Sequence, residues 1–269
     1  MTVERFTTSA GQVWPVEVDG DGPAVLALHG VGGGAYFFRG LASRLDFTRR
    51  VIATDLPAGL TPDGLVEPAD MGAWADGLVE VVGAVAPAPI AVIGHSLGTI
   101  LALELWRRRP DLIRCLVFVG GLPEVREGVR QRLSERAAAI RTSGSMEGWG
   151  PRVSPGVFGS QAARRAPEAI GMFERLLEAH HPGTYVRNLE ALLAASARDV
   201  VPTVTVPCCS ISGTDDNYAP PDGVQAFISA LPGPCERVLF KGVGHMPFFE
   251  VPEEFAGAVG AFLNRICAS

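Results

Sequence analysis

A serine lies at the point where a buried strand is expected to meet a helix. The segment Gly94-His95-Ser96-Leu97-Gly98 follows the apolar run APIAVI and precedes TILALELW. A Gly-x-Ser-x-Gly sequence in this position is typical of a sharp turn that holds the serine hydroxyl above the carboxyl ends of the strands. The motif alone also occurs by chance in glycine-rich chains, so the prediction depends on the strand and the helix around it. We predict that Ser96 is a nucleophile.

The serine needs a base, and a carboxylate that orients the base, because a neutral hydroxyl is a weak nucleophile. His245 is the predicted base, since it lies in the loop after the last expected strand, in GVGHMPFFEVPEEF. Asp216 is the predicted carboxylate. It lies in ISGTDDNYAP, which follows the expected strand TVPCCSISG, the last but one in the chain. The neighbouring Asp215 is interpreted as a turn residue or as a hydrogen-bond partner of the site. Serine, aspartate and histidine then follow one another along the chain in the order expected for such a triad.

The other four histidines are expected to have different roles. His95 is adjacent to the serine, which makes it a poor candidate for the base, so a packing role is favoured. His29 ends the first central strand and is predicted to fix the loop that follows. His180 and His181 are expected to be structural or solvent-facing, with the lining of a pocket as the open alternative.

A developing oxyanion needs two fixed N–H donors. The backbone N–H of Leu97, at the start of a helix, is one predicted donor. The other is the N–H of Val31 in the glycine-rich segment LHGVGGGAY, with Gly32 as the alternative. A flexible turn and a phosphate loop are the competing interpretations of this segment. It has neither the Lys-Ser/Thr of a P-loop nor the spacing of GxGxxG.

Strands and helices alternate from residue 24 to residue 121, after an expected antiparallel hairpin over residues 3–22. Wholly apolar strands separated by helices predict a parallel sheet that is covered on both faces. One of the helices is expected over residues 37–45. Residues 122–200 hold helical segments without an apolar strand, and the segment 143–156 is expected to break them. The strand–helix pattern then resumes, which predicts one domain that carries a helical cap.

The composition bounds the class of protein. The 269-residue chain has a net charge of −6 and no basic stripe, so no nucleic-acid partner is expected. No apolar stretch reaches the roughly 18 residues that span a bilayer, and the N-terminus has no signal-type apolar segment. The 5 cysteines have no metal-ligand spacing, so free thiols in a reducing compartment are expected. We expect a cytoplasmic monomer or homodimer that takes a small-molecule carbonyl substrate, with no membrane partner, no metal and no cofactor.

Four segments resemble the α/β-hydrolase family, in the same order: HGVGGG, GHSLG, GTDDNYAP and GHMPFFEVPEEF. The resemblance covers almost the whole chain. It implies an α/β fold with a mostly parallel eight-stranded sheet, helices on both faces and a helical cap inserted after the sixth strand. The core is then formed by residues 1–121 and 201–269, and the cap by residues 122–200. The segment TDLPAGL departs from the Asp-Leu-Pro-Gly-His-Gly-x-Ser of many members after Pro57, so the resemblance does not define that loop.

Within this family the chain is similar to lactonases, esterases and C–C-bond hydrolases with short caps. Residues 185–213 resemble the cap-to-core return of 3-oxoadipate enol-lactonase-like sequences, and HGVGGG is similar to the glycine-rich loop of meta-cleavage-product hydrolases. A serine at position 96 argues against haloalkane dehalogenases and epoxide hydrolases, which use an aspartate nucleophile.

The predicted function is serine hydrolysis of a carboxylic ester, lactone or thioester through an acyl-enzyme. One alternative is a C–C bond hydrolase or a non-hydrolytic enzyme on the same fold, such as a lyase, cyclase, acyltransferase or perhydrolase. The other is a ligand receptor without catalysis, because a fold alone does not establish an activity.

The cap is expected to determine which substrate is bound. Candidate pocket residues are one glycine and six aromatic residues that are as easily part of an ordinary core: Gly32, Phe37, Phe38, Trp149, Phe158, Phe173 and Tyr185. The arginines that could bind a substrate carboxylate are Arg126, Arg130, Arg136 and Arg152. Because glutamates are interleaved with these arginines, we expect a solvent-exposed helix face with many salt bridges instead.

Overall fold

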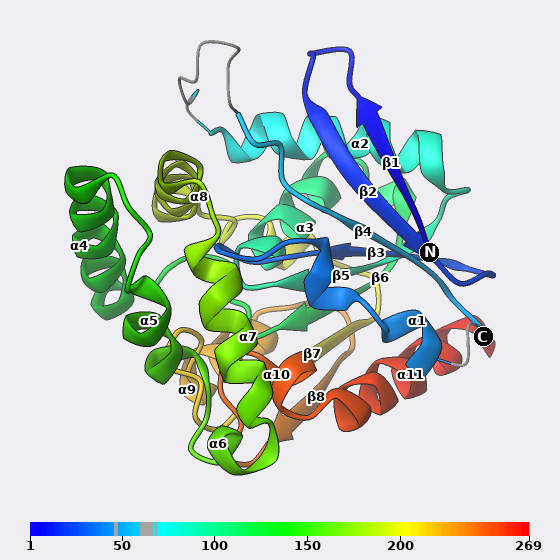
Figure 1. Cartoon of the computed structure of the whole chain (residues 1–269). Helices are drawn as coiled ribbons and strands as arrows, with labels where there is room; N and C mark the ends of the chain where they lie inside the picture. The colour runs from blue at the N-terminus through cyan, green and yellow to red at the C-terminus, as the bar shows by residue number, and fades with distance from the viewer. Residues whose placement is uncertain (46–47, 60–66, 68, 269) are drawn as a thin grey trace.

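The strands of the chain form one sheet. A computed structural model describes residues 1–45, 48–59, 67 and 69–268. Within these residues, eight strands lie in the order β1-β2-β4-β3-β5-β6-β7-β8 (Figure 1). β1 (Thr2–Thr7) and β2 (Val13–Asp19) form an antiparallel hairpin, and β2 is also antiparallel to β4 (Arg50–Thr54). The remaining neighbours are parallel, so the predicted mostly parallel, eight-stranded sheet is confirmed.

The central strands are the short apolar runs of the sequence. They are β4, β3 (Ala24–Leu28), β5 (Ile90–His95), β6 (Ile113–Val119) and β7 (Cys208–Gly213), whereas β8 (Cys235–Phe240) forms the edge of the sheet and is only partly buried. Every residue of β3, β5 and β7 is buried. A parallel strand is buried in this way when helices cover both faces of the sheet.

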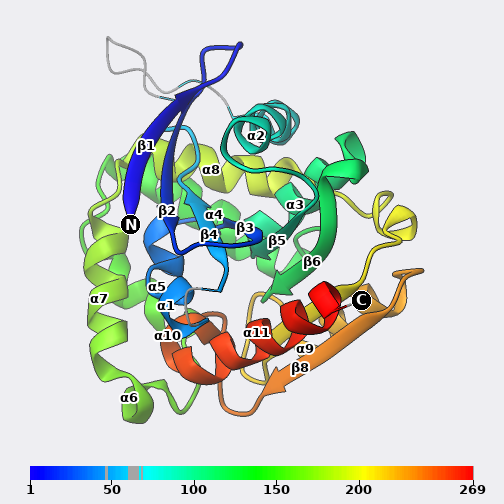
Figure 2. The same ribbon diagram turned by 90° about the vertical axis from the view of Figure 1, so that its right-hand side faces the viewer.

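Helices cover the two faces of the sheet. α2 (Met71–Val85) and α3 (Leu97–Arg108) lie on one face, and α1 (Leu41–Arg44) and α11 (Pro252–Ala268) lie on the other (Figures 1 and 2). Two short elements precede strands, η2 (Pro110–Leu112) before β6 and η3 (Val201–Thr203) before β7, and two follow strands, α9 (Pro221–Ser229) after β7 and α10 (Pro247–Glu250) after β8. This arrangement confirms the predicted fold class.

The single helix expected over residues 37–45 is not present. The structure has a short 3-10 helix, η1 (Ala35–Phe38), and α1 begins only at Leu41. Gly40 lies between them with φ = +79°, a left-handed conformation that interrupts a right-handed helix and that glycine adopts without steric cost. The apolar spacing in this segment therefore belongs to two short turns.

Five helices lie between β6 and β7, a stretch that the structure describes throughout, and we call them the α4–α8 layer. They are α4 (Glu127–Ser143), α5 (Trp149–Val157), α6 (Ala162–Arg165), α7 (Pro167–Glu178) and α8 (Pro182–Ala194). Figure 1 shows the layer grouped beside the sheet, on the side away from both chain ends. The division of the chain into a core and a cap at residues 121–122 and 200–201 stays a prediction.

The α5 helix lies where a break was expected, over residues 143–156. The break is present over residues 144–148, between α4 and α5, but α5 occupies the remaining residues 149–156, and both of its prolines fit into the helix. Pro151 is in the first turn, where a backbone N–H has no helical acceptor and its loss costs little. Pro155 lies inside the helix and removes only the hydrogen bond to the carbonyl of Pro151.

The α4–α8 layer contacts the loops at the carboxyl edge of the sheet. His180 lies 3.3 Å from the carbonyl oxygen of Gly33, through its Nε2 atom. Arg187 donates from Nη1 to the carbonyl of Pro57 at 2.7 Å, so the loop that departs from the family pattern is bound to α8. These contacts place the layer over the strand ends.

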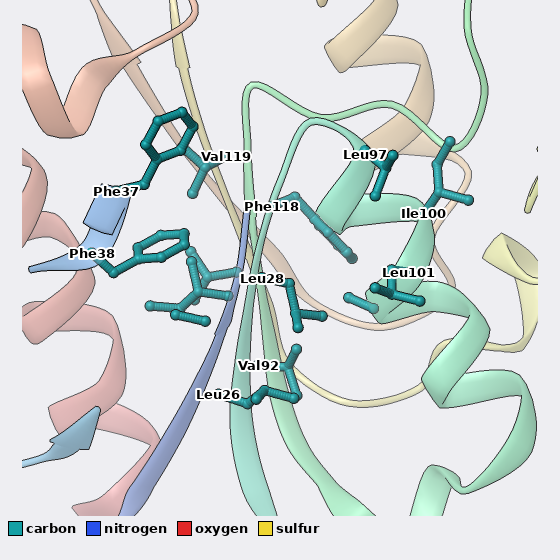
Figure 3. Close-up of a cluster of buried hydrophobic side chains, with 14 of the residues drawn as sticks. Leu26, Leu28, Phe37, Phe38, Val92, Leu97, Ile100, Leu101, Phe118 and Val119 are labelled. Carbon is teal, nitrogen blue, oxygen red and sulfur yellow. The ribbon is translucent and has the colours of Figure 1, made fainter. Parts of the chain in front are cut away.

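Buried side chains fill the space between the sheet and its helices. Figure 3 shows one such cluster, in which side chains of α3 face the central strands and Phe37 and Phe38 lie on the opposite side of those strands. The labelled residues in the figure are each at most 3% exposed: Leu26, Leu28, Phe37, Phe38, Val92, Leu97, Ile100, Leu101, Phe118 and Val119. Truncating one such side chain to alanine typically costs about 2–5 kcal/mol. This packing fixes the start of α3, and with it Ser96.

Candidate active site

The carboxyl ends of neighbouring parallel strands lie side by side. Leu28 at the end of β3 pairs with Gly94 of β5, and Gly213 at the end of β7 pairs with Phe240 of β8. The loops that follow these strands therefore meet at one edge of the sheet, where ligands of parallel sheets bind. The predicted serine, aspartate and histidine follow β5, β7 and β8, respectively.

Ser96 occupies a strained turn between β5 and α3. Its φ of +54° is the one positive value found for a non-glycine residue in the described part of the chain, and such strain is common at functional sites. Its backbone N–H donates to the carbonyl of Val119 at 3.1 Å. A Cβ at Gly94 would lie under 3.0 Å from the Gly98 backbone, and one at Gly98 under 3.0 Å from the Leu28 carbonyl oxygen. The two glycines of the motif are thus required by the close approach of strand and helix.

His245 and Asp216 form a buried hydrogen-bonded pair. His245 Nδ1 lies 2.9 Å from Asp216 Oδ2 and 3.0 Å from Oδ1, and the residues are 5% and 3% exposed. Asp216 Oδ1 also accepts the N–H groups of Tyr218 and Ala219, at 2.8 and 2.9 Å. A carboxylate can only accept, so the proton of the neutral imidazole is on Nδ1 and the lone pair is on Nε2.

Ser96 and His245 line the same cavity, beneath the α4–α8 layer. The cavity has a volume of about 40 Å³, which is roughly the space of one water molecule. Most of its wall is apolar: Leu133, Val157, Phe173, Leu177, Leu189 and Leu192. An adjoining cavity of about 40 Å³ also contacts both residues. In this conformation, the two cavities leave little free volume beside Ser96 and His245.

Comparison with known proteins identifies the family. The model of the alpha/beta hydrolase family matches residues 25–258, a stretch that includes Ser96, Asp216 and His245. The chain belongs to the alpha/beta hydrolase family. The predicted resemblance is therefore confirmed over most of the chain.

The proteins that are similar to this chain include two esterases and an enol-lactonase. The pimeloyl-[acyl-carrier protein] methyl ester esterase of Neisseria meningitidis is 28% identical, over 89% of this chain and 92% of the relative. A thermophilic esterase from Thermogutta terrifontis has the same fold, with a TM-score of 0.85, 22% identity and 99% coverage of both chains. The enol-lactonase of Burkholderia xenovorans has a TM-score of 0.85 at 20% identity and covers 97% of this chain and 100% of its own.

The predicted oxyanion donors lie beside Ser96. Leu97 is the first residue of α3, where the positive end of the helix dipole attracts negative charge. Val31 lines the cavity together with Ser96, in a turn that the N–H of Gly33 closes by donating to the carbonyl of Gly30 at 3.1 Å. Within the described residues, neither the Leu97 N–H nor the Val31 N–H donates to a backbone acceptor. The choice between Val31 and Gly32 as donor stays a prediction.

His95 contacts the backbone of the histidine loop. Its Nε2 lies 3.0 Å from the carbonyl oxygen of His245, which can only accept, so the proton of His95 is on Nε2. No donor among the described residues reaches its buried Nδ1. Burial, together with the neighbouring His245, holds the pKa of His95 well below its ordinary value. His95 therefore stays neutral and supports the loop of His245.

Two other predicted residues hold loops in place. His29 contacts the carbonyl of its neighbour Gly30 at 2.7 Å and accepts the N–H of Leu56 at 3.2 Å, which connects the loops after β3 and β4. Asp215 has a different partner from Asp216, since its Oδ2 accepts the N–H of Ser160 at 2.9 Å. The side chain and the backbone N–H of Ser160 together lower the pKa of the Asp215 carboxyl.

The predicted pocket residues are divided between the cavity wall and the packing around it. Tyr185 and Phe173 line the cavity. Gly32 lies behind Tyr185, because a Cβ there would contact the ring. The others pack elsewhere: Phe37 against His95, Phe38 against Phe248, Phe158 against Phe173, and Trp149 beneath Arg152.

Two polar residues of the cavity are Tyr218, which was not predicted, and Arg136, which was one of four arginines considered for a substrate carboxylate. Tyr218 lies two residues after Asp216, and its ring centroid is 5.0 Å from that of His245. Arg136 was expected on a solvent-exposed face with salt bridges, but it is partly buried and lines the cavity. The buried residues of α4 include Val129, Leu133 and Ile140, and Arg136 continues their helical spacing. That spacing is the signal that places its side chain on the inner face.

The described residues contain no cluster of three or more histidine, cysteine or carboxylate side chains placed to hold a metal ion. None of the described helices has the length and apolarity needed to cross a bilayer. A larger cavity, of about 640 Å³, lies between α4 and α8, and its lining includes His181 and Glu190 but none of the predicted catalytic residues. Cavity size therefore does not locate the site in this molecule.

Proposed function

We propose that this alpha/beta hydrolase is a serine hydrolase that cleaves a carboxylic ester, lactone or thioester through an acyl-enzyme on Ser96. The buried hydrogen bond of 2.9 Å between Asp216 and His245 carries the proposal, because His245 lines the same cavity as the strained Ser96. The names of the esterase and lactonase relatives support the same class of reaction.

In the first step, the Nε2 lone pair of His245 takes the proton of the Ser96 hydroxyl as Oγ attacks the substrate carbonyl. Asp216 keeps the other imidazole proton on Nδ1 and stabilises the positive charge that develops on the ring. The carbonyl oxygen becomes an oxyanion, which the N–H groups of Leu97 and Val31 or Gly32 bind. Removing one such donor typically lowers the rate by about 10²–10³-fold.

The intermediate then collapses, and the bond between the carbonyl carbon and the leaving group breaks. His245 gives its proton to the departing alkoxide or thiolate, so an alcohol or thiol leaves and an acyl group remains on Ser96. His245 next removes a proton from water, which attacks the acyl carbon. The acid is released, and the proton returns to Ser96 Oγ.

Replacement of the nucleophile tests this function. Ser96→Ala should lower p-nitrophenyl acetate hydrolysis by roughly 10⁴-fold or more, and it should abolish covalent labelling by a fluorophosphonate, located by mass spectrometry. The matched control is Ser134→Ala, which removes an exposed serine of α4. Wild-type rates in Ser96→Ala, or a label on another residue, would refute the proposal. Product analysis in ¹⁸O-labelled water separates hydrolysis, which places the label in the acid, from acyl transfer and lyase chemistry.

A further inference from the structure

The guanidinium of Arg136 reaches the cavity from α4 without a carboxylate partner. Its Nη2 donates to the hydroxyl of Tyr218 at 2.8 Å and its Nη1 to the hydroxyl of Tyr185 at 3.2 Å. Among the described residues, no aspartate or glutamate forms an ion pair with it, whereas Arg126 pairs with Asp222 at 3.0 Å. Both partners of Arg136 are neutral phenols.

The cavity wall offers no negative charge to Arg136. Of its described lining residues, Arg136 is the one with a permanent charge, and none is aspartate or glutamate. An arginine remains charged at every ordinary pH. Placing a cation on an apolar wall is unfavourable unless a partner of opposite charge is supplied. An anionic group is therefore the kind of partner that suits the guanidinium of Arg136.

The two tyrosines add hydrogen-bond donors beside the guanidinium of Arg136. Each phenol oxygen accepts from Arg136, so each keeps its own O–H to donate. A guanidinium with two hydroxyl groups is suited to a planar carboxylate, with which arginine forms strong charge-assisted hydrogen bonds. The ring of Tyr218 is close to both groups, because its centroid lies 6.0 Å from the guanidinium carbon of Arg136 and 5.0 Å from the ring centroid of His245.

We propose that the substrate carries a carboxylate, which Arg136, Tyr185 and Tyr218 bind while Ser96 attacks an ester, lactone or thioester carbonyl elsewhere in the same molecule. The inference rests on the proposed function and specifies its substrate class as a half-ester or lactone of a dicarboxylic acid. Arg136 is then the residue that distinguishes anionic from neutral substrates.

Two series of substrates test the inference. The anionic series consists of the p-nitrophenyl hemiesters of succinate, glutarate and adipate, and the neutral series consists of p-nitrophenyl alkanoates of the same chain lengths. We expect a higher kcat/KM for at least one hemiester than for its neutral counterpart. Arg136→Gln should lower this anionic-to-neutral ratio by about tenfold or more, mainly through KM, and Arg136→Lys should retain part of it.

Arg141→Gln is the matched control, because Arg141 is an exposed arginine of the same helix that pairs with Glu190. It should leave the anionic-to-neutral ratio unchanged. A wild-type ratio of one or less at every chain length would overturn the inference. An equal loss with both series in Arg136→Gln, or an unchanged ratio in that variant, would also overturn it.

Binding without turnover separates the two proposals. In the Ser96→Ala protein, calorimetry should detect binding of free glutarate or adipate, and the additional change Arg136→Gln should abolish it. If the wild type hydrolyses neither series but the dicarboxylate binds through Arg136, then the proposed hydrolysis fails and the carboxylate site stands. If esters are hydrolysed but no dicarboxylate binds, then the carboxylate site fails and the hydrolase stands.

Discussion

At the scale of single residues, His245 is the residue of the proposed site that hydrogen bonds from three separate segments hold in place. Asp216 accepts from its ring at Nδ1, His95 donates to its carbonyl oxygen at 3.0 Å, and its own backbone N–H donates to Val157 at 2.6 Å. These contacts come from the loop after β7, from the serine turn and from α5. They fix both the orientation of the imidazole ring and the loop that carries it, so the proposed base is already in position before a substrate binds.

Asp216→Asn tests whether the carboxylate selects the imidazole tautomer. The amide oxygen of asparagine can keep the hydrogen bonds from Tyr218 and Ala219 to Oδ1, while the NH₂ group replaces Oδ2, which lies 2.9 Å from His245 Nδ1. The NH₂ donates to Nδ1, so the imidazole proton moves to Nε2 and the base loses its lone pair toward Ser96. We expect kcat for p-nitrophenyl acetate to fall by roughly 10³–10⁴-fold.

The fold of this variant should be preserved, because it keeps the shape of the side chain. Asp215→Asn is the matched control, since Asp215 bonds to Ser160 rather than to His245. We expect kcat near the wild-type value in that control. A loss of kcat as large as that of Asp216→Asn would mean that the loop, rather than the tautomer, determines the rate.

At the scale of elements, the close approach of α3 to β3 determines where Ser96 lies. A Cβ on Gly98 would lie under 3.0 Å from the carbonyl oxygen of Leu28. Gly98→Ala should therefore push α3 away from the sheet, which we expect to cost about 1–3 kcal/mol in the free energy of unfolding. It should also lower esterase activity, because Ser96 lies at the start of the displaced helix. Urea unfolding and ester hydrolysis measure the two effects.

Gly257→Ala is the helical control for Gly98→Ala. Gly257 lies in α11, and a Cβ there would have no described neighbour within 4 Å. Alanine is favoured over glycine in a helix by roughly 0.5–1 kcal/mol, so this variant should be more stable than the wild type and equally active. If Gly98→Ala is as stable and as active as Gly257→Ala, then the close approach of α3 to Leu28 does not determine the position of Ser96.

The sequence predicts the strands well, because the central strands are continuous apolar runs, as expected for parallel strands that are buried on both faces. It predicts α3 and the serine turn equally well, since a strand, two glycines and a helix occur together. It fails over α5, because Pro151 fits into the first turn of that helix and Pro155 removes only one backbone hydrogen bond inside it. It also fails at Arg136, because periodicity identifies the inner face of α4 only when the arginine is counted with Leu133 and Ile140. Which side chains close the cavity depends on how separate segments pack, and local patterns do not contain that information.

At the scale of the whole molecule, two carboxylates join the α4–α8 layer to the loops of the proposed site. Glu250 is buried and accepts the N–H of Gly159 and the N–H of Gly244, both at 2.9 Å. Asp215 accepts the N–H of Ser160. The chain between α5 and α6 is therefore bound directly to the segment that carries His245.

The ionisation of Glu250 should make the stability of the molecule depend on pH. Burial raises the pKa of the Glu250 carboxyl above the ordinary value of 4.5, so the folded protein holds this proton more tightly than the unfolded chain does. The contribution to stability is complete below pH 4.5 and is lost as the pH rises through the folded pKa. The free energy of unfolding of the wild type, relative to that of Glu250→Gln, should therefore fall as the pH rises from below 4.5 to neutrality.

Glu80→Gln provides a comparison of opposite sign. Hydrogen bonds from the N–H and the hydroxyl of Ser9 lower the pKa of Glu80, so its contribution is present above the unfolded pKa and is lost as the pH falls through the folded pKa. Relative to Glu80→Gln, the wild type should gain stability with rising pH. Urea unfolding of the three proteins across this range measures both slopes. Slopes of the same sign for the two pairs, or a flat difference for Glu250→Gln, would show that burial does not control the ionisation of Glu250, because Glu250 is buried and Glu80 is not.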